Sequence, residues 1–322
     1  MFMKRALIIG IGGQDGAYLA KLLLDKGYQV FGTSRDATTS SFANLSKLGI
    51  LGRVENFSLA INDFRSVITT IKKTNPDEIY NLAGQTSVGL SFEQPVETME
   101  SISIGTLNLL EAIRFIGNPI RFYSAGSSEC FGDVGNLAAT EDTPFSPMSP
   151  YAVAKVAAYG LIANYRAAYN IFACSGILFN HESLLRPDRF VTQKIVQTAY
   201  RISLGSNEKL CLGNLNIYRD WGWAPEYVEA MWLMLQQEKP DDFIIATGRT
   251  VSLKYFVEKS FDYFDLNAQD FLEIDKRLFR PSDIHTGRAD PSKAKNILGW
   301  SNKYDVDDVI KDMCSFMQSN KL

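Results

Sequence analysis

The sequence has few of the residues that metal centres and disulfide scaffolds require. It contains only two histidines and four cysteines in 322 residues, and the cysteines lie far apart. They are Cys130, Cys174, Cys211 and Cys314. This spacing predicts neither a zinc knuckle nor a disulfide framework, so we expect the cysteines to be reduced and mostly buried. A centre with several histidine ligands is excluded, and we predict that no metal is bound.

Long apolar runs and an excess of positive charge are missing as well. No stretch approaches the roughly 18 apolar residues of a membrane span, and the apolar segment within residues 1–13 is too short for a signal peptide. Lys and Arg total 33 against 36 Asp and Glu, which gives a formal net charge of -3. Such a balance produces no field that attracts phosphate backbones or anionic lipids. We expect a cytoplasmic protein that binds neither nucleic acid nor membranes.

The first 180 residues alternate strand-like and helix-like segments. We predict strands over residues 6–9, 29–33, 54–59, 78–82, 120–124 and 172–178, and helices over residues 14–25, 63–73, 96–115 and 151–169. This alternation indicates right-handed crossovers and a parallel sheet that is covered by helices. The predicted fold class is therefore α/β, a doubly wound parallel-sheet Rossmann domain with a smaller α/β lobe.

The alternation loosens after residue 180. There we predict helices over residues 191–203, 224–237, 253–264 and 306–317, and a strand over residues 243–246. We assign residues 1–180 to the dinucleotide-binding Rossmann domain, with a segment at about 218–248 that returns to it. Residues 181–322 are assigned to the smaller lobe, and the chain is long enough for two such units.

A glycine-rich turn follows the first predicted strand and opens the first predicted helix. Gly10, Gly13 and Gly16 allow a tight turn and a close backbone approach, and a helix amino terminus favours a pyrophosphate. The turn therefore predicts a dinucleotide site. After the second strand, Arg35 suits the 2′-phosphate of NADP, whereas Asp36 could accept a ribose hydroxyl of NAD, lie in solvent or pair with Arg35. We predict NADP and leave NAD open.

Two Tyr-x-x-x-Lys pairs occur in predicted helices, Tyr151 with Lys155 and Tyr255 with Lys259. This spacing places both side chains on one helix face, where an ammonium group lowers a phenol pKa and lets tyrosine act as a base. Chance alone gives about one such pair in this chain. No other motif accompanies the second pair, so we interpret it as a surface or packing feature.

Polar residues after the strand over 120–124 distinguish the first pair. The carboxyl ends of strands in such a sheet face the ligand crevice, which would bring Ser127 and Glu129 near Tyr151. Ser127 could hydrogen-bond a substrate hydroxyl, and Glu129 could serve as a second acid or base. Glu129 could instead be a solvated loop carboxylate.

Together these residues resemble the GDP-mannose 4,6-dehydratase family of the extended short-chain dehydrogenase/reductase superfamily. The resemblance runs almost end to end. It rests on residues 10–19, 80–83, 149–155, 176–183 and 219–222. The Asn-His-Glu-Ser run at 180–183 and the Arg-Asp-Trp-Gly run at 219–222 are more specific than the glycines.

The resemblance implies a role for each matching residue. Ser127, which replaces the family's threonine, is implied to be catalytic together with Glu129, Tyr151 and Lys155. Cofactor contacts are implied for Gly10, Gly13, Gln14, Asp15, Gly16, Arg35, Leu82, Ala83, Gln85, Thr86, Tyr151, Lys155, His181 and Arg186. Contacts to the nucleotide-sugar are implied for Ser87, Asn180, Lys194, Arg219, Arg280 and Asp283, since guanidinium groups suit a pyrophosphate. Considered without the family, Lys194 could be solvated, His181 could be a hydrogen-bonded histidine behind the site, and Arg219 could be a packing residue.

The reaction that the resemblance implies is an internal redox cycle on a GDP-hexose with tightly held NADP. Tyr151 would take the O4 proton as hydride leaves C4 for the cofactor. Glu129 would then remove the C5 proton and help to expel the C6 hydroxyl as water, after which hydride returns to C6. The expected product is a GDP-4-keto-6-deoxy sugar. Alternatives are a nucleotide-sugar reductase or epimerase, which would not need Glu129, a catalytically silent NADP-binding protein, or a dehydratase for a relative such as a GDP-heptose.

Several positions depart from the family pattern. Ala60 and Ile61 replace a pair that holds the adenine, Asp36 replaces a basic residue, and Leu184 replaces a proline. Asp283 replaces a glutamate that helps to read the guanine, and keeps its charge on a shorter arm. By the same resemblance we expect a homodimer through the helices over residues 96–115 and 151–169. A tetramer through the loop after Arg35 is a weaker expectation because that loop departs from the pattern.

Overall fold

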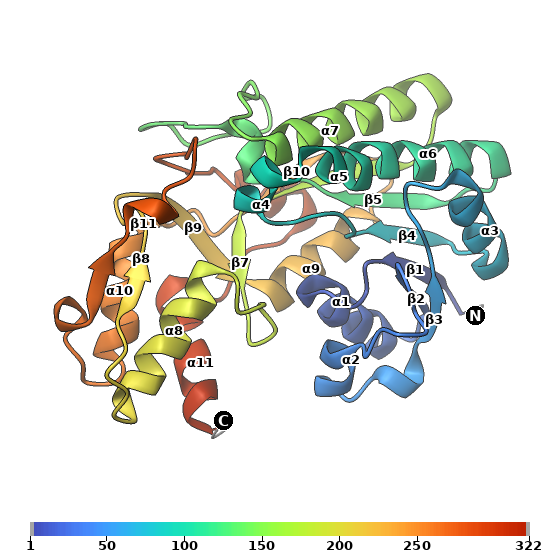
Figure 1. Ribbon diagram of the computed structural model, residues 1–322. Helices are drawn as coiled ribbons and strands as arrows, with labels where there is room; N and C mark the ends of the chain where they lie inside the picture. The colour runs from blue at the N-terminus through green and yellow to red at the C-terminus, as the bar shows by residue number, and fades with distance from the viewer. Residues whose placement is uncertain (1–2, 320–322) are drawn as a thin grey trace.

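The computed structural model describes residues 3–319, and a parallel seven-stranded sheet forms their centre (Figure 1). Its strand order is β10, β6, β5, β4, β1, β2, β3. The strands are β1 (Arg5–Ile9), β2 (Gln29–Ser34), β3 (Glu55–Ser58), β4 (Glu78–Asn81), β5 (Arg121–Ala125), β6 (Ala173–Leu178) and β10 (Phe243–Ile245). The strand order reverses between β1 and β4, and ligands of such sheets bind outside the carboxyl ends of the strands at this point. The predicted doubly wound α/β class is confirmed.

Helices cover both faces of this sheet. Strand residues alternate between the faces, so Ile8 and Tyr80 lie in one apolar cluster while Leu7 and Ile79 lie in the other. The first cluster includes side chains of α1 (Gln14–Asp25) and α9 (Ala224–Met234), and the second includes side chains of α3 (Phe64–Thr74), α6 (Gly105–Ile116) and α7 (Pro150–Tyr169). The apolar faces of these helices hold the sheet between two layers.

A second, smaller apolar core lies beside the sheet, on the left of Figure 1. Its helices α8 (Val191–Ser203), α10 (Leu253–Asp262) and α11 (Val306–Ser319) pack against one another. Its strands are β7 (Asn180–Glu182), β9 (Tyr218–Trp223) and β11 (Thr250–Ser252), which form one sheet, and β8 (Leu210–Leu212) and β12 (Leu272–Ile274), which form another. The division into lobes at residues 1–180 and 181–322 stays a prediction, and residues 320–322 lie outside the described part.

The helix predicted over residues 96–115 differs from the structure. It consists of α5 (Pro95–Met99), a π-helical turn (Glu100–Ile104) and α6. In the wider turn, the Ser101 hydroxyl accepts a hydrogen bond from the Gln85 amide (3.2 Å), and the Ser103 hydroxyl donates to the Ala154 carbonyl (3.0 Å). The irregular turn thereby connects the loop after β4 to α7.

Other predicted helices agree closely with the structure, and several short elements were not predicted. The helices over residues 14–25 and 191–203 coincide with α1 and α8, and the helix over 224–237 ends earlier, at Met234. The unpredicted helical segments are α2 (Ala43–Lys47), η1 (Leu51–Arg53), α4 (Val88–Glu93), η3 (Ser128–Phe131), η4 (Ala268–Asp270), η5 (Lys276–Leu278) and η6 (Ala294–Leu298). Between residues 3 and 319, no helix has the length and apolarity to cross a bilayer.

Candidate active site

A cavity of about 470 Å³ opens beyond the carboxyl ends of the central strands and reaches into the smaller core. Its lining includes the segment after β5, the first turns of α7 and α8, strand β7 and loops near residues 213 and 280. Fifteen of the residues predicted for the site lie in this lining. They are Asp15, Leu82, Thr86, Ser87, Ser127, Glu129, Tyr151, Lys155, Asn180, His181, Arg186, Lys194, Arg219, Arg280 and Asp283.

The glycine-rich turn lies next to this cavity and tolerates no larger residue at two positions. Gly10 has a φ of +86°, and a Cβ there would lie 3.1 Å from backbone atoms of Ala83. A Cβ on Gly16 would lie 2.6 Å from the Gly10 carbonyl oxygen. Helix α1 begins directly after Gly13, which supplies no side-chain cap. The turn is thus a backbone cradle at an open helix amino terminus, and this arrangement fits a pyrophosphate.

A buried polar chain joins the start of α1 to β7. The Gln14 amide donates to the His181 carbonyl (3.1 Å) and accepts from the Ser183 hydroxyl (2.7 Å). The His181 Nε2 lies 2.9 Å from the Asp15 carboxylate, and its Nδ1 lies 2.7 Å from the Phe179 carbonyl oxygen. Burial alone would lower the His181 pKa, but Asp15 outweighs burial and raises it. The Asn-His-Glu-Ser run therefore anchors the glycine-rich turn.

Helix α7 carries Tyr151 and Lys155 on its buried face. The helix begins at Pro150, with the Ser149 hydroxyl accepting a hydrogen bond from the Ala152 amide (3.1 Å). The Lys155 ammonium donates to the Ala125 carbonyl (2.7 Å) at the end of β5, and burial lowers its pKa to about 8. We expected the phenol pKa of Tyr151 to be lowered. It is raised instead, because burial outweighs the hydrogen bond from Ser127.

Ser127 and Glu129 line the same cavity and follow β5 in the chain. The Ser127 hydroxyl accepts a hydrogen bond from the Glu129 amide (3.3 Å), which fixes the turn between them. Burial raises the pKa of the Glu129 carboxyl, while the charges of Arg219 and Arg280 oppose this rise. Glu129 is therefore a basic carboxylate that faces the cavity, and is not a solvated loop residue.

Two arginines and an aspartate form the opposite wall. The Arg219 guanidinium donates to the Tyr218 carbonyl (2.9 Å) and lies 3.3 Å from Asp283 Oδ1. Arg280 Nη1 lies 3.4 Å from the same oxygen. Burial lowers the pKa of Arg219, and the neighbouring Glu129 and Asp283 counter this effect. This wall supplies positive charge that can bind an anion.

The remaining polar residues line the space between these two walls. Lys194 is not free in solvent, since its ammonium donates to the Cys211 carbonyl (2.7 Å). Arg186 lies against the Phe190 ring (3.7 Å), and its Nε lies 3.0 Å from Glu182 but is not aligned for a hydrogen bond. The lining also holds residues that the sequence did not indicate, among them Arg189, Phe190, Asn214 and Phe279.

Seven predicted site residues lie outside the cavity lining: Gly10, Gly13, Gln14, Gly16, Arg35, Ala83 and Gln85. The four from the first turn belong to the cradle described above. Ala83 contacts Gly10, and Gln85 donates to the Ser87 carbonyl (2.6 Å). The Arg35 side chain is 87% exposed, and its guanidinium lies 3.5 Å from the Glu97 carboxylate and does not pair with Asp36. Asp36 accepts hydrogen bonds from Thr38 and Thr39, so its carboxylate is engaged in its own turn.

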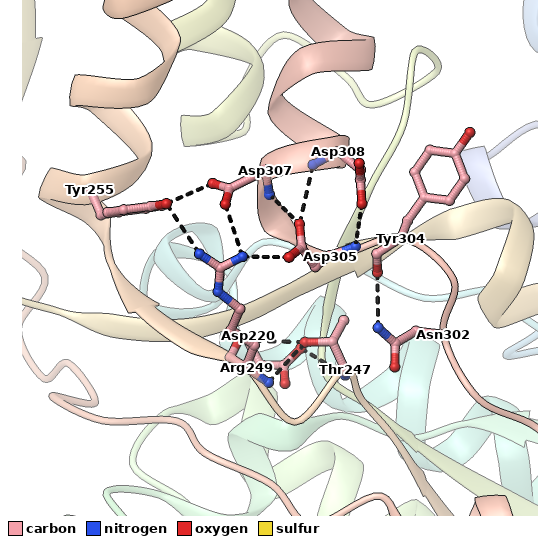
Figure 2. A network of polar contacts seen from close by, with 9 residues as sticks. All are labelled: Asp220, Thr247, Arg249, Tyr255, Asn302, Tyr304, Asp305, Asp307 and Asp308. Atoms are coloured by element: carbon pink, nitrogen blue, oxygen red, sulfur yellow. Dashed lines mark hydrogen bonds and ion pairs between the residues drawn. The ribbon is translucent and has the colours of Figure 1, made fainter.

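The second tyrosine–lysine pair belongs to a separate polar network. Figure 2 shows the Tyr255 hydroxyl between Asp307 (2.7 Å) and Arg249 (3.1 Å). In the same network, the buried Asp220 carboxylate accepts hydrogen bonds from Thr247 and the Gly248 amide. Tyr255 is half-buried and Lys259 is exposed, and both lie outside the cavity lining, as expected for a surface or packing feature.

All four cysteines are free thiols, and three of them are buried. Within residues 3–319, no group of three histidine, cysteine, aspartate or glutamate side chains is placed to hold a metal ion.

Comparison with known proteins gives both family and fold. The family model described as GDP-mannose 4,6 dehydratase matches residues 7–313. The GDP-mannose 4,6 dehydratase 1 of Arabidopsis thaliana is 46% identical over 320 residues, which cover 96% of this chain and 88% of that protein. The Dictyostelium discoideum GDP-mannose 4,6 dehydratase is 42% identical over 336 residues, with 96% and 94% covered. A crystal structure of dTDP-glucose 4,6-dehydratase from Bacillus anthracis in complex with NAD shares the fold, with a TM-score of 0.86, 18% identity and coverage of 99% and 97%.

Proposed function

The chain belongs to the GDP-mannose 4,6-dehydratase family, and from this premise we propose that it converts GDP-D-mannose to GDP-4-keto-6-deoxy-D-mannose. One observation supports the proposal above all. Glu129 shares a cavity with Ser127, Tyr151 and Lys155, while a wall of arginines lies opposite. Hydride transfer alone needs only the serine, tyrosine and lysine. An additional basic carboxylate is what the removal of a carbon-bound proton and the elimination of water require.

The residues present fit a nicotinamide dinucleotide. A Cβ on Gly10 or Gly16 would collide with neighbouring backbone, so the two glycines keep the turn close-packed, and the turn leads into the uncapped start of α1. Lys155, His181 and Arg186 line the adjoining cavity and would hold the rest of the cofactor. When bound, the cofactor supplies a reversible hydride acceptor, so that the substrate undergoes only a net loss of water.

We assign the cofactor as NADP. Asp36 is held by Thr38 and Thr39 in its own turn, whereas Arg35 extends into solvent with a single loose contact to Glu97. An exposed guanidinium suits a 2′-phosphate, and a ribose 2′-hydroxyl would need a carboxylate that is free to accept. NAD is the competing cofactor in the experiment below.

Proton transfer at O4 is the role of Tyr151. Its phenol pKa is raised by burial, so the phenolate must be stabilised before it can take a proton. Ser127 supplies a hydrogen bond, and the ammonium of Lys155 lies 5.7 Å from the ring centroid of Tyr151. As Tyr151 takes the O4 proton, the C4 hydroxyl becomes a ketone and the C5–H bond becomes acidic.

Elimination is the role of Glu129. Burial raises the pKa of Glu129, which makes its carboxylate a stronger base, while the charges of Arg219 and Arg280 favour the ionised form. Glu129 takes the C5 proton and delivers it to the C6 hydroxyl, which leaves as water as the C5–C6 double bond forms. A proton from solvent replaces the one lost from C5 as C6 is reduced.

The proposed ligands of the GDP portion are Asn180, Lys194, Arg219 and Arg280. Ser87 is assigned to the sugar. The two guanidiniums and the ammonium provide charge-assisted hydrogen bonds to a diphosphate. Asp283 lies between the arginines where the family has glutamate, and this difference makes a related nucleotide-sugar, such as a GDP-heptose, the second candidate substrate.

The proposal is tested by incubating the protein with GDP-mannose and catalytic NADP in D2O and analysing the sugar by mass spectrometry. The expected product has lost one water and carries deuterium at C5, with no net reduction of NADP. E129Q should form this product about 10²–10⁴-fold more slowly than the wild type. NAD should support less turnover than NADP. Unchanged GDP-mannose with the wild-type protein would contradict the assigned substrate.

We also propose a homodimer that works in the cytoplasm. Exposed apolar side chains lie on α5, α6 and α7, which run side by side in Figure 1; they include Val96, Phe115, Val153 and Tyr169. Such a shared apolar surface favours an isologous contact between two copies. Free, buried thiols are typical of a reducing compartment.

A further inference from the structure

The arginine wall of the cavity already contains an anion of its own. The Arg219, Asp283 and Arg280 side chains are 7%, 24% and 37% exposed. A single oxygen, Asp283 Oδ1, lies 3.3 Å from Arg219 and 3.4 Å from Arg280. Charge-assisted hydrogen bonds are usually about 2.7–2.9 Å. Both contacts are therefore longer than usual, because one carboxylate oxygen of Asp283 is shared by the guanidinium groups of Arg219 and Arg280.

The two arginines differ in how firmly they are held. Arg219 is part of β9, which pairs with β7 and β11, and its guanidinium also donates to the Tyr218 carbonyl. Arg280 lies in the loop after η5, and within residues 3–319 the structure shows Asp283 as its hydrogen-bond partner. An arriving anion would therefore leave Arg219 in place and draw Arg280 away from Asp283.

The position of Asp283 does not suit the reading of a base. A carboxylate that reads guanine must present both oxygens to the ring N–H groups, but one oxygen of Asp283 is occupied by the two guanidiniums.

We infer that Asp283 is the internal counter-ion of the diphosphate subsite, which competes with the diphosphate of the nucleotide-sugar for Arg219 and Arg280. The inference rests on the proposed function, since it requires a nucleoside-diphosphate ligand. Asp283 weakens the binding of both substrate and product nucleotide, and it holds the buried Arg219 charge neutralised between turnovers.

Calorimetry of the full-length protein saturated with NADP tests this role with three probes: GDP, inorganic pyrophosphate and guanosine. D283N removes the negative charge with little change in shape. We expect it to bind GDP and pyrophosphate about fivefold more tightly, the size of one partly exposed ion contact, with no change for guanosine. D283E should bind all three probes as the wild type does.

Asp241 provides the matched control. It pairs with Lys293 at 2.8 Å, and both residues lie outside the cavity lining. D241N removes one carboxylate charge from an ion pair and should leave the affinity for all three probes unchanged. Any of three results would overturn the inference. D283N could bind both GDP and guanosine more weakly, D283N could bind every probe as the wild type does, or D283E could bind guanosine more tightly. Failure of the wild type to dehydrate GDP-mannose would instead contradict the proposed function, so the two failures are distinguishable.

Discussion

Helices α7 and α10 carry the same Tyr-x-x-x-Lys spacing, yet only α7 places it at the cavity. Both helices begin after a serine cap, Ser149 and Ser252. The lysine ammonium lies 5.7 Å from the tyrosine ring centroid in α7 and 5.8 Å in α10. The internal geometry of the pair is thus a property of the helix, whereas its chemistry depends on the surroundings.

The surroundings differ in burial and in available partners. Lys155 is buried and donates to the Ala125 carbonyl, so its pKa falls to about 8. Lys259 is exposed, and Tyr255 is already bonded to Asp307 and Arg249 (Figure 2). The hydrogen bond to the Asp307 carboxylate raises the pKa of Tyr255, and its hydroxyl lies outside the cavity lining, so it is not placed to take a substrate proton.

The largest predicted effect is the loss of catalysis on removing one hydroxyl from α7. Y151F should lower the turnover of GDP-mannose by about 10²–10⁴, because the O4 proton then has no acceptor. Y255F removes the same group from the first turn of α10 and should retain wild-type turnover. Initial rates from mass spectrometry compare the two variants, and an equal loss in both would refute the distinction between the helices.

The sequence predicted the pair and its helix but could not predict this difference. Periodicity and caps are local, so α1, α7 and α8 were placed within a residue or two of their observed bounds. One partner of Tyr255 is Asp307, 52 residues away, and one partner of Arg219 is Asp283, 64 residues away. Such contacts depend on the tertiary arrangement, which no local pattern encodes.

The same limit explains what was missed at the site, whereas the contacts of the cofactor loop are local. Phe190, Asn214 and Phe279 line the cavity from loops that have no motif of their own. Sequence left open whether Asp36 pairs with Arg35, because adjacent residues of opposite charge allow it. In the structure the Asp36 carboxylate accepts hydrogen bonds from Thr38 and Thr39, a local turn that aspartate favours.

A second, smaller difference between the pairs concerns stability as a function of pH. The folded-state pKa of Lys155 is about 8, below the roughly 10.4 of an unfolded lysine. The unfolded chain thus binds more protons between these values, and this group makes the free energy of unfolding rise with pH in that window. K155M lacks the group, so wild type should gain about 1 kcal/mol relative to K155M between pH 8 and 9.

Urea unfolding of nucleotide-free protein at pH 7, 8 and 9 measures this gain. K259M is the matched control, since it removes an exposed lysine from α10, and its difference from wild type should stay constant with pH. A wild-type protein that loses stability relative to K155M as pH rises would show that the Lys155 ammonium is stabilised, and not destabilised, by its site.

The smallest predicted effect distinguishes a helix cap from an ion pair in the polar network next to α10. Asp305 Oδ1 accepts from the Asp307 and Asp308 amides (2.8 and 3.3 Å) at the start of α11, while its Oδ2 pairs with Arg249. D305A removes both contacts and should lower the free energy of unfolding by about 1 kcal/mol, as the loss of a cap does. D305N keeps the cap and removes only the ion pair.

We expect D305N to lower the free energy of unfolding by only a few tenths of a kcal/mol, because the Arg249 and Asp305 side chains are 39% and 41% exposed. Raising the salt concentration should shrink the D305N effect and leave most of the D305A effect. Both variants should turn over GDP-mannose at the wild-type rate, since Asp305 and its partner Arg249 lie outside the cavity lining. A D305N loss as large as that of D305A would mean that the ion pair, and not the cap, holds α11 against α10.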